Sequence, residues 1–377
     1  MKRSVIPIAA ALIFVSCGKA PPPDVGDDAA EAVITGSMAL EYAEQFSVDY
    51  RSDGCSVIRI GEDSFMFVPE GAEIPDDTQG MRVIEQPAGN IYLAASSAMD
   101  LFDGLGELDR VTMTSTEPRN WSLPNVLNAF SEDKLTYIGK YSAPDYEALV
   151  ESDCPLAIES TMIYHSPEVK EKIEQLGIPV MVERSSYETH PLGRMEWIKL
   201  YGLLVGKSGE AERIFAEKAA VFEALSAVDI PEDERRTAAF FYISSNGSIN
   251  VRKPGDYISK MIELAGGRYI LTADDLSIDE NALSTMNIQP EVFYELARDA
   301  DILIYNSTIE GGIESTSQLT EKCAILADFK AVKEGRVWCT EQDMFQQTTG
   351  AADMIADLNR IFTGDTSEGT VYLHQME

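Results

Sequence analysis

One stretch, residues 156–187, limits the possible folds more than any other part of the chain. It places two short apolar runs, 156–158 and 178–182, on either side of a helical pattern at 167–176 that ends before Gly177. Glycine is a common helix stop, and apolar runs of this length are typical of buried strands. Two strands joined by one helix are parallel, with a right-handed crossover. The pattern therefore predicts an α/β fold.

Polar residues follow each of these strands directly. They are Glu159, Ser160 and Thr161 after the first strand, and Arg184, Ser185 and Tyr187 after the second. Ligands of open α/β sheets bind beyond the carboxyl ends of the strands. We therefore expect these residues to line a ligand site. Ser96 and Ser97 follow another predicted strand, 90–95, and are expected to cap a helix at 98–105, whose free N–H groups favour an anionic group.

A second unit of the same kind follows. Strands are expected at 238–243 and 302–305, and a helix at 257–265. The run Tyr146-Glu147-Ala148-Leu149 before the first unit's strand is echoed by Tyr294-Glu295-Leu296-Ala297 before 302. Between the units, residues 192–225 have helical spacing, and the piece from 210 to 226 would be about 25 Å long. We predict two Rossmann-like lobes with parallel-rich sheets, joined by a single long α-helix, with a ligand cleft between them.

The N-terminus has the layout of an export signal. Lys2 and Arg3 precede an apolar run at 5–15, and Cys17 follows in a context that resembles a bacterial lipobox, from which Phe14 departs. The expected divisions are a lipoprotein signal peptide at 1–16, a tether at 17–32, an N-terminal lobe at 33–190 opening with a β-hairpin, a connecting helical segment at 191–228 and a C-terminal lobe at 229–377. Acylated Cys17 would anchor the chain to the outer face of the cytoplasmic membrane; secretion without lipid and a signal anchor remain alternatives.

Charge and cysteine content exclude several classes of protein. The formal net charge of −33 makes nucleic acid a poor partner, because a polyanion would be repelled. Besides Cys17, the four cysteines show no CxxC metal pattern, and a disulfide between Cys323 and Cys339 is possible in an exported chain. Three histidines are too few for a bare zinc or manganese site, and His374 falls in the terminal tail. His190 is either an axial metal ligand or an ordinary hydrogen-bonded histidine.

The scarce basic residues and several aromatic residues fall in predicted strand-end loops. Arginine pairs bidentately with carboxylate or phosphate groups, and tyrosine offers a flat apolar face with a polar tip. Salt bridges and partial core positions are the ordinary alternatives. The predicted ligand-binding set is Ser96, Ser97, Lys140, Tyr141, Glu159, Ser160, Thr161, Arg184, Ser185, Tyr187, His190, Arg194, Ser245, Asn246, Arg252, Tyr257, Asn306, Phe345 and Gln346.

Five segments carry a family resemblance. They are NIYLAASSAMDLFDGLGELDRV, GKYSAPDYEAL, ESTMIYHSPEV, SSYETHPLGRMEWIKLYG and VWCTEQDMFQQTTG. They resemble ABC-transporter substrate-binding proteins of the iron-complex and cobalamin class. The resemblance implies a monomer that holds a ferric siderophore, haem or cobalamin between its lobes and delivers it to a membrane permease and its ATPase. It also implies that Glu147 docks on the permease, with Glu291, or else Glu295, on the second lobe.

Two other functions remain open. An exported enzyme of the same fold could process a cofactor or ester, and a surface module could store the ligand without a permease. The chain has no GxSxG, GxxxxGK[ST] or HExxH motif, so we expect neither catalytic residues nor a catalytic cofactor.

Overall fold

The N-terminal lobe is built on a parallel five-stranded sheet. The computed structural model describes residues 32–78, 80–226, 230–279, 282 and 284–377, so the predicted signal peptide, Cys17 and most of the tether lie outside it. The strand order is β12-β11-β6-β7-β8, and every pairing is parallel. The elements are β6 (Ile91–Leu93), β7 (Val111–Thr114), β8 (Thr136–Tyr137), β11 (Ala157–Ser160), β12 (Val180–Glu183), α1 (Ser96–Gly104), α2 (Pro124–Ser131), α3 (Tyr146–Glu151) and α4 (Pro167–Gln175).

The predicted strand–helix–strand unit is present as β11, α4 and β12. Gly177, at φ +85°, lies just past α4. The loop placement predicted for Glu159 and Ser160 is wrong, because parallel pairing continues through Glu159↔Val182 and Ser160↔Glu183. Both residues therefore belong to β11.

The C-terminal lobe has a mixed sheet of order β16-β14-β13-β17-β18-β19, with β15 paired to β13. Its parallel centre is β13, β17 and β18, and α9 precedes β17 as α3 precedes β11, in keeping with the echo in the sequence. The elements are β13 (Thr237–Ile243), β14 (Ile249–Arg252), β15 (Arg268–Tyr269), β16 (Thr285–Ile288), β17 (Ile302–Tyr305), β18 (Val337–Thr340), β19 (Leu373–Gln375), α7 (Tyr257–Leu264), α8 (Ala273–Leu276), α9 (Pro290–Ala297), α10 (Ser307–Glu310), α11 (Thr316–Lys322) and α12 (Lys330–Lys333).

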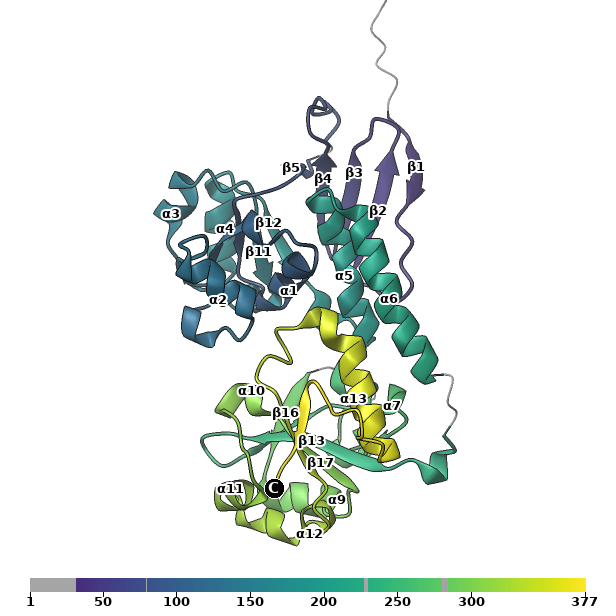
Figure 1. Ribbon diagram of the computed structural model, residues 1–377. Coiled ribbons are helices and arrows are strands. Elements are labelled where there is room, and N and C mark those ends of the chain that lie inside the picture. Colours follow the sequence, from purple (N-terminus) through teal and green to yellow (C-terminus); the bar gives the residue numbers. More distant parts are fainter. Residues whose placement is uncertain (1–31, 79, 227–229, 280–281, 283) are drawn as a thin grey trace, which may run out of the picture.

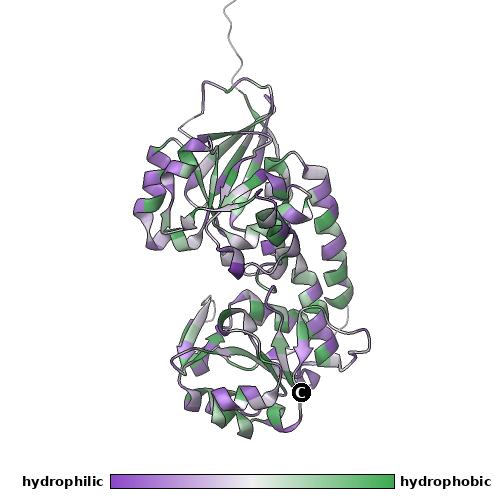
Figure 2. Ribbon diagram, turned by 60° about the vertical axis from the view of Figure 1, so that its left-hand side comes forward, coloured by the Kyte–Doolittle hydropathy of each residue, from purple (hydrophilic) through white to green (hydrophobic). Residues whose placement is uncertain are grey.

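Helices α5 (Pro191–Leu204) and α13 (Ala351–Thr363) both pack against α6 (Ser208–Ser226), α5 in the N-terminal half of the molecule and α13 in the C-terminal half (Figure 1). Helix α6 spans from the N-terminal lobe to the C-terminal one, as predicted for the long connector. It packs closely on α5, because a Cβ on Gly202 would lie 2.5 Å from the Cβ of Ala211. Lys218 of α6 pairs with Asp353 of α13. Figure 2 shows apolar residues concentrated in the strands of both lobes.

A second five-stranded sheet precedes the N-terminal lobe, here called the N-terminal sheet. The predicted hairpin is confirmed as β3 paired with β4, but it belongs to the larger order β1-β2-β3-β4-β5. One face packs on α5, where the rings of Phe46 and Trp197 lie 4.9 Å apart. The strands are β1 (Ile34–Ser37), β2 (Phe46–Arg51), β3 (Ser56–Ile60), β4 (Asp63–Val68) and β5 (Arg82–Glu85).

Residues 40–45, here called the strap, tie the N-terminal sheet to α5. The buried Glu196 carboxylate accepts the backbone N–H groups of Glu41, Tyr42 and Ala43 at 2.8–3.0 Å and pairs with Lys199 at 2.9 Å. The buried Glu188 accepts those of the next two residues at 2.8 and 3.0 Å. Each buried charge is therefore compensated by several donors.

The cysteines in the described residues are free. Cys55, Cys154 and Cys339 are buried, and Cys323 is half-buried. The disulfide considered for Cys323 and Cys339 is therefore absent; Cys339 lies inside β18, and its Sγ faces the carbonyl of Thr340. None of the helices in the described part of the chain is both long enough and apolar enough to cross a membrane.

Candidate functional site

The carboxyl edge of the N-terminal lobe's sheet faces the C-terminal lobe. Beyond β7, Gln346 donates to the carbonyl of Asn120 at 2.7 Å and accepts from the N–H of Ser122 at 2.9 Å. Beyond β6, Thr348 donates to the carbonyl of Ser97 at 2.7 Å. Two predicted site residues, Ser97 and Gln346, therefore lie where the lobes meet.

Four predicted residues gather between the lobes and are here called the interlobe cluster: Arg194, Arg252, Tyr257 and Phe345. The Arg194 guanidinium carbon, from α5, lies 4.0 Å from the ring centre of Tyr257 in α7. That of Arg252 lies 4.9 Å from the ring centre of Phe345. The two rings meet edge to face at 6.5 Å. Each arginine is therefore held on an aromatic face.

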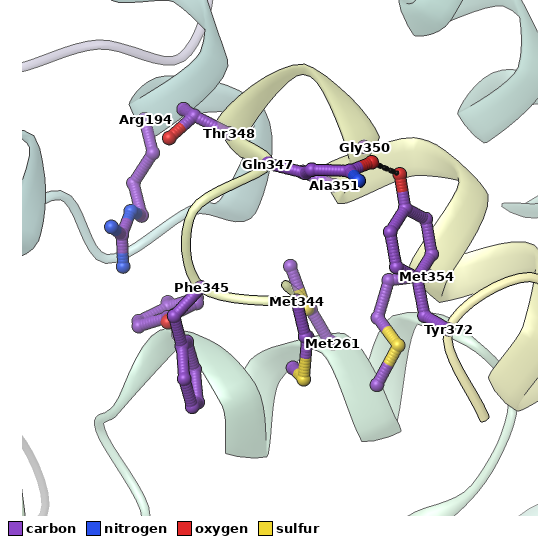
Figure 3. A pocket seen from close by; sticks show the side chains of 11 residues that line it. Arg194, Met261, Met344, Phe345, Gln347, Thr348, Gly350, Ala351, Met354 and Tyr372 are labelled. Carbon is purple, nitrogen blue, oxygen red and sulfur yellow. Dashed lines mark hydrogen bonds between the residues drawn. The ribbon is translucent and has the colours of Figure 1, made fainter. Parts of the chain in front are cut away.

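The positive charge of the interlobe cluster is only partly neutralised. Arg252 has Asp256 at 3.5 Å, whereas Arg194 makes no ion pair within 4 Å among the described residues, although its charge partly offsets the rise that burial causes in the pKa of Glu183. Burial raises the pKa of Tyr257, so its phenol stays neutral. Figure 3 shows Arg194 and Phe345 at one side of a small pocket of about 30 Å³, which Met261, Met344 and Met354 also line. This arrangement suits an anionic group attached to an apolar body.

A second group lies beyond β11 and β12 and is here called the tyrosine–arginine surface: Tyr164, Arg184 and Tyr187. Arg184 donates through Nη1 to the Tyr164 hydroxyl at 3.2 Å, and its guanidinium carbon lies 4.9 Å from the ring centre of Tyr187. Tyr164 and Tyr187 are 46% and 36% exposed. Sequence reasoning missed Tyr164, although its position three residues after Thr161 at a strand end was a usable signal.

Several predicted polar residues serve local structure. Ser160 accepts from the N–H of Met162 at 3.3 Å, and Thr161 meets Ser186 at 3.3 Å. Ser185 is buried. The predicted capping by Ser96 and Ser97 is wrong: α1 begins at Ser96, and its cap is Ala95, which offers no side-chain acceptor.

Glu159 is enclosed within the protein, and His190 is packed against aromatic rings. Glu159 is 0% exposed, and burial raises its pKa to about 8. His190 caps α5 by accepting the N–H of Leu192 at Nδ1, 3.1 Å, and its ring stacks 4.5 Å from that of Tyr42. Burial lowers the pKa of His190 to about 4. This placement favours the hydrogen-bonded alternative for His190 over an axial metal ligand.

The remaining predicted residues are dispersed. Lys140 is exposed in the short hairpin of β9 (Gly139–Lys140) and β10 (Ala143–Pro144), and Tyr141 packs partly on the lobe's outer core. Ser245 and Asn246 are exposed in the β13–β14 turn. Asn306 is buried and caps α10 by accepting the N–H of Thr308 at 3.1 Å.

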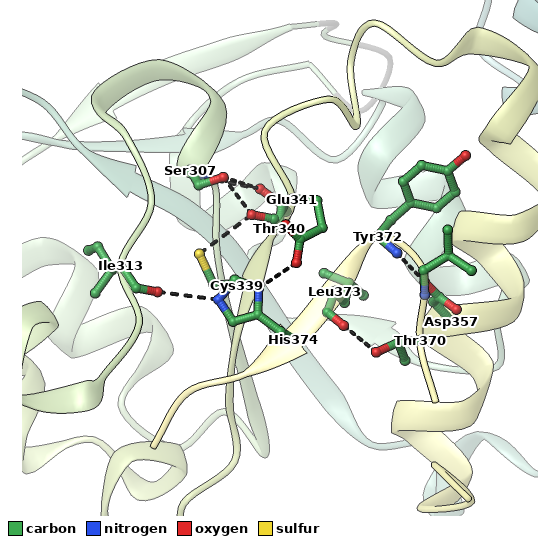
Figure 4. Close-up of polar contacts among 11 residues, drawn as sticks. Ser307, Ile313, Cys339, Thr340, Glu341, Asp357, Thr370, Tyr372, Leu373 and His374 are labelled. Carbon is green, nitrogen blue, oxygen red and sulfur yellow. Dashed lines mark hydrogen bonds and ion pairs between the residues drawn. The ribbon is translucent and has the colours of Figure 1, made fainter. Parts of the chain in front are cut away.

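An acidic hollow of about 720 Å³ opens beyond β17 and β18 of the C-terminal lobe. Its polar lining includes Ser122 from the other lobe, Glu314, Glu341, Asp343 and His374. His374 meets Glu341 at 2.7 Å and the carbonyl of Ile313 at 3.4 Å (Figure 4). The placement of His374 in a terminal tail is wrong, because β19 pairs with β18 through Cys339↔His374. Within the described residues, no three His, Cys, Asp or Glu side chains form a group suited to a metal ion.

Comparison with known proteins fits this two-lobed geometry. A family described as periplasmic binding protein matches residues 91–344. The chain belongs to the periplasmic binding protein family. The N-terminal sheet and the strap lie before the matched region.

Individual relatives agree with this assignment. Two uncharacterized lipoproteins of Methanocaldococcus jannaschii are each 25% identical to this chain. The match to the first covers 76% of this chain and 68% of the relative, and the match to the second covers 82% of this chain and 78% of the relative. A periplasmic haem-binding protein of Vibrio cholerae superposes with a TM-score of 0.56 at 16% identity, covering 70% of this chain and 96% of that one. A petrobactin-binding protein of Bacillus subtilis superposes with a TM-score of 0.56 at 18% identity, covering 72% of this chain and 91% of that one. At these identities the structures share the fold.

Proposed function

We propose that the chain is a lipid-anchored extracytoplasmic receptor that captures a chelated metal, as a ferric siderophore, haem or cobalamin, and delivers it to an ABC import permease. The observation that carries the proposal is the interlobe cluster, in which Arg194 lacks a carboxylate partner among the described residues of a strongly acidic chain. An anionic ligand group would supply the missing counter-charge. The likeness in fold to a haem-binding and a petrobactin-binding protein supports this ligand class.

The two polar regions of the cleft narrow the ligand further. The interlobe cluster favours a carboxylate or catecholate with an apolar body, whereas the carboxylates of the acidic hollow would repel a ligand that is anionic on every side. We therefore place chelates with one anionic face, such as haem, ahead of uniformly acidic ones.

The test is to titrate the mature protein with haem, ferric siderophores and cobalamin while recording absorbance and tryptophan fluorescence. Trp121 adjoins Asn120 and Ser122, which Gln346 contacts, so its emission should report lobe movement. Arg194→Ala combined with Arg252→Ala should weaken binding by more than about tenfold without a matching loss of thermal stability.

The matched control is Arg298→Ala, which removes another arginine stacked on a tyrosine, 5.4 Å from the ring of Tyr294, outside the interlobe cluster. It should leave affinity unchanged. Absence of stoichiometric binding by any of the chelates, together with turnover of a chromogenic ester, would favour the exported enzyme instead.

A further inference from the structure

We propose that Gln45 of the strap is a positioning residue of the ligand site, which holds Arg184 ready for an anionic ligand without neutralising its charge. The inference rests on the proposed function. It assigns part of the site to a segment that precedes the family match at residue 91.

The contact between Gln45 and Arg184 is two-pronged. Gln45 Oε1 accepts from Arg184 Nε at 3.3 Å and from Nη2 at 3.1 Å. The other amino group, Nη1, donates to Tyr164, and the guanidinium lies over Tyr187. The amide oxygen therefore fixes the edge of the guanidinium formed by Nε and Nη2, which leaves its positive charge available beside the Tyr187 ring and the Tyr164 hydroxyl.

The N-terminal sheet encloses the same guanidinium from a second direction. Gly61, in the β3–β4 turn, has φ +59°, and a Cβ there would lie 3.2 Å from Arg184 Nη1. A side chain at residue 61 would therefore crowd the arginine. The strap and the turn together restrict the directions that Arg184 can take.

Gln45 is itself held rigidly. Its backbone N–H donates to the buried Glu188 at 3.0 Å, and Glu188 also accepts from Trp197 Nε1 at 2.9 Å. Groups fixed before the ligand arrives lose less entropy on binding. A neutral amide suits this task, because a carboxylate in its place would form an ion pair and cancel the positive charge.

The ligand chemistry follows from the three side chains of the tyrosine–arginine surface. One guanidinium held between the Tyr187 ring and the Tyr164 hydroxyl, with both tyrosines exposed, fits a flat conjugated or catechol-bearing chelate with a carboxylate or phenolate at its edge. Gln45 acts on this ligand only through Arg184. Its effect should therefore depend on the ligand's charge.

The test uses Gln45→Glu, with haem as the anionic probe and a neutral ferric trihydroxamate as the charge control. Gln45→Glu should weaken haem binding about tenfold and change trihydroxamate binding little. The salt dependence of haem affinity should fall, because one unpaired cation is lost. Gln175→Glu adds the same charge at an exposed position of α4 and should have no effect.

A double-mutant cycle separates positioning from loss of structure. In an Arg184→Ala background, Gln45→Glu should cause no further loss of haem affinity. If the wild type binds haem but Gln45→Glu leaves affinity unchanged, or weakens both ligands equally with a drop in Tm, the positioning role is overturned while the receptor function stands. If the wild type binds neither of these two ligands at a measurable level, the positioning role is overturned, whereas the receptor function fails only if catecholate siderophores and cobalamin are not bound either.

Discussion

At the scale of single residues, buried acids differ sharply in how they are compensated. Glu196 accepts three backbone N–H groups and pairs with Lys199, whereas neither oxygen of Glu159 has a hydrogen-bond partner among the described residues. Burial raises the pKa of Glu159 from 4.5 to about 8. The folded protein therefore keeps a proton that the unfolded chain releases, and stability falls as pH rises through this window.

Glu159→Gln should abolish the loss of stability that the ionisation of Glu159 causes as the pH rises. Glutamine has nearly the same shape and carries no charge, so Tm should match the wild type near pH 5 and exceed it by about 2 °C or more near pH 9. Thermal unfolding at the two pH values measures this. Glu171→Gln, at an exposed position of α4, is the control. Equal Tm values for Glu159→Gln and the wild type at pH 9 would contradict the expectation.

The rule that ligand-binding residues follow the ends of strands identified several residues of the site, but it did not predict the directions of their side chains. It placed Arg194, Tyr257 and Phe345 at or near strand-end loops, and the structure brings the three together, although Arg194 lies within α5 and Tyr257 begins α7. It misplaced Glu159, because polar residues can extend a buried parallel strand when the neighbouring strand continues. It missed Gln45, whose contact with Arg184 spans 139 positions and leaves no local pattern.

At the scale of elements, the α5–α6 contact depends on two small residues. Gly202 lets α6 approach so closely that an added Cβ would also lie 3.1 Å from the carbonyl oxygen of Lys207. Helix propensity alone would favour alanine over glycine within a helix. Here the close packing outweighs it.

Gly202→Ala should therefore destabilise the protein, by about 1–3 kcal/mol, as overpacked cores do. Gly209→Ala is a matched control, because it also lies in a helix but has no heavy atom within 4 Å of the added Cβ. That variant should be neutral or slightly stabilised. Chemical denaturation of both measures the difference, and equal midpoints would argue against close packing at Gly202.

The elements with local signals were predictable. In the β11–α4–β12 unit and in the β3–β4 hairpin, the spacing of the apolar residues and the residues that end each element all fall within about 30 positions of the sequence. The N-terminal sheet as a whole was not predictable, because β5 joins β4 by a parallel pairing, Phe65↔Arg82, across an irregular connection. Long-range pairings of this kind leave no periodic trace in the sequence.

At the scale of the whole molecule, side-chain hydrogen bonds from the C-terminal lobe reach the N-terminal lobe. Besides Gln346 and Thr348, Thr349 donates to Asp100 through its N–H and its hydroxyl, both at 2.7 Å. These contacts come from a single segment after β18. The segment is therefore positioned to set the distance between the lobes.

Gln346→Ala should favour a more open arrangement in the absence of ligand, because both of its hydrogen bonds cross between the lobes. Small-angle scattering should show a larger radius of gyration, and amide exchange near Asn120 and Ser122 should speed up. Gln342→Ala, at an exposed position in the same loop, is the control. An unchanged radius and unchanged exchange would show that the bridge contributes little.

Glu147 and Glu291 are exposed in the first turns of α3 and α9, one on each lobe. If they dock on a permease, Glu147→Ala should reduce ligand uptake several-fold while ligand affinity stays constant, since charged interface contacts are worth this much. Uptake and affinity are measured separately. Glu151→Ala, exposed on the same helix, should preserve uptake. Normal uptake by Glu147→Ala would remove it as a docking residue.

The strap would also transmit mechanical tension from the N-terminus to α5. Strand β1 begins at Ile34, soon after the proposed tether. The backbone N–H groups of the strap donate hydrogen bonds to Glu188, just before α5, and to Glu196, within α5. Tension from an acylated N-terminus would therefore be borne by the N-terminal half, whereas the other half, joined through α6 and α13, would carry none. On a membrane the N-terminal half would be held in place, and the C-terminal half would be free to move relative to it.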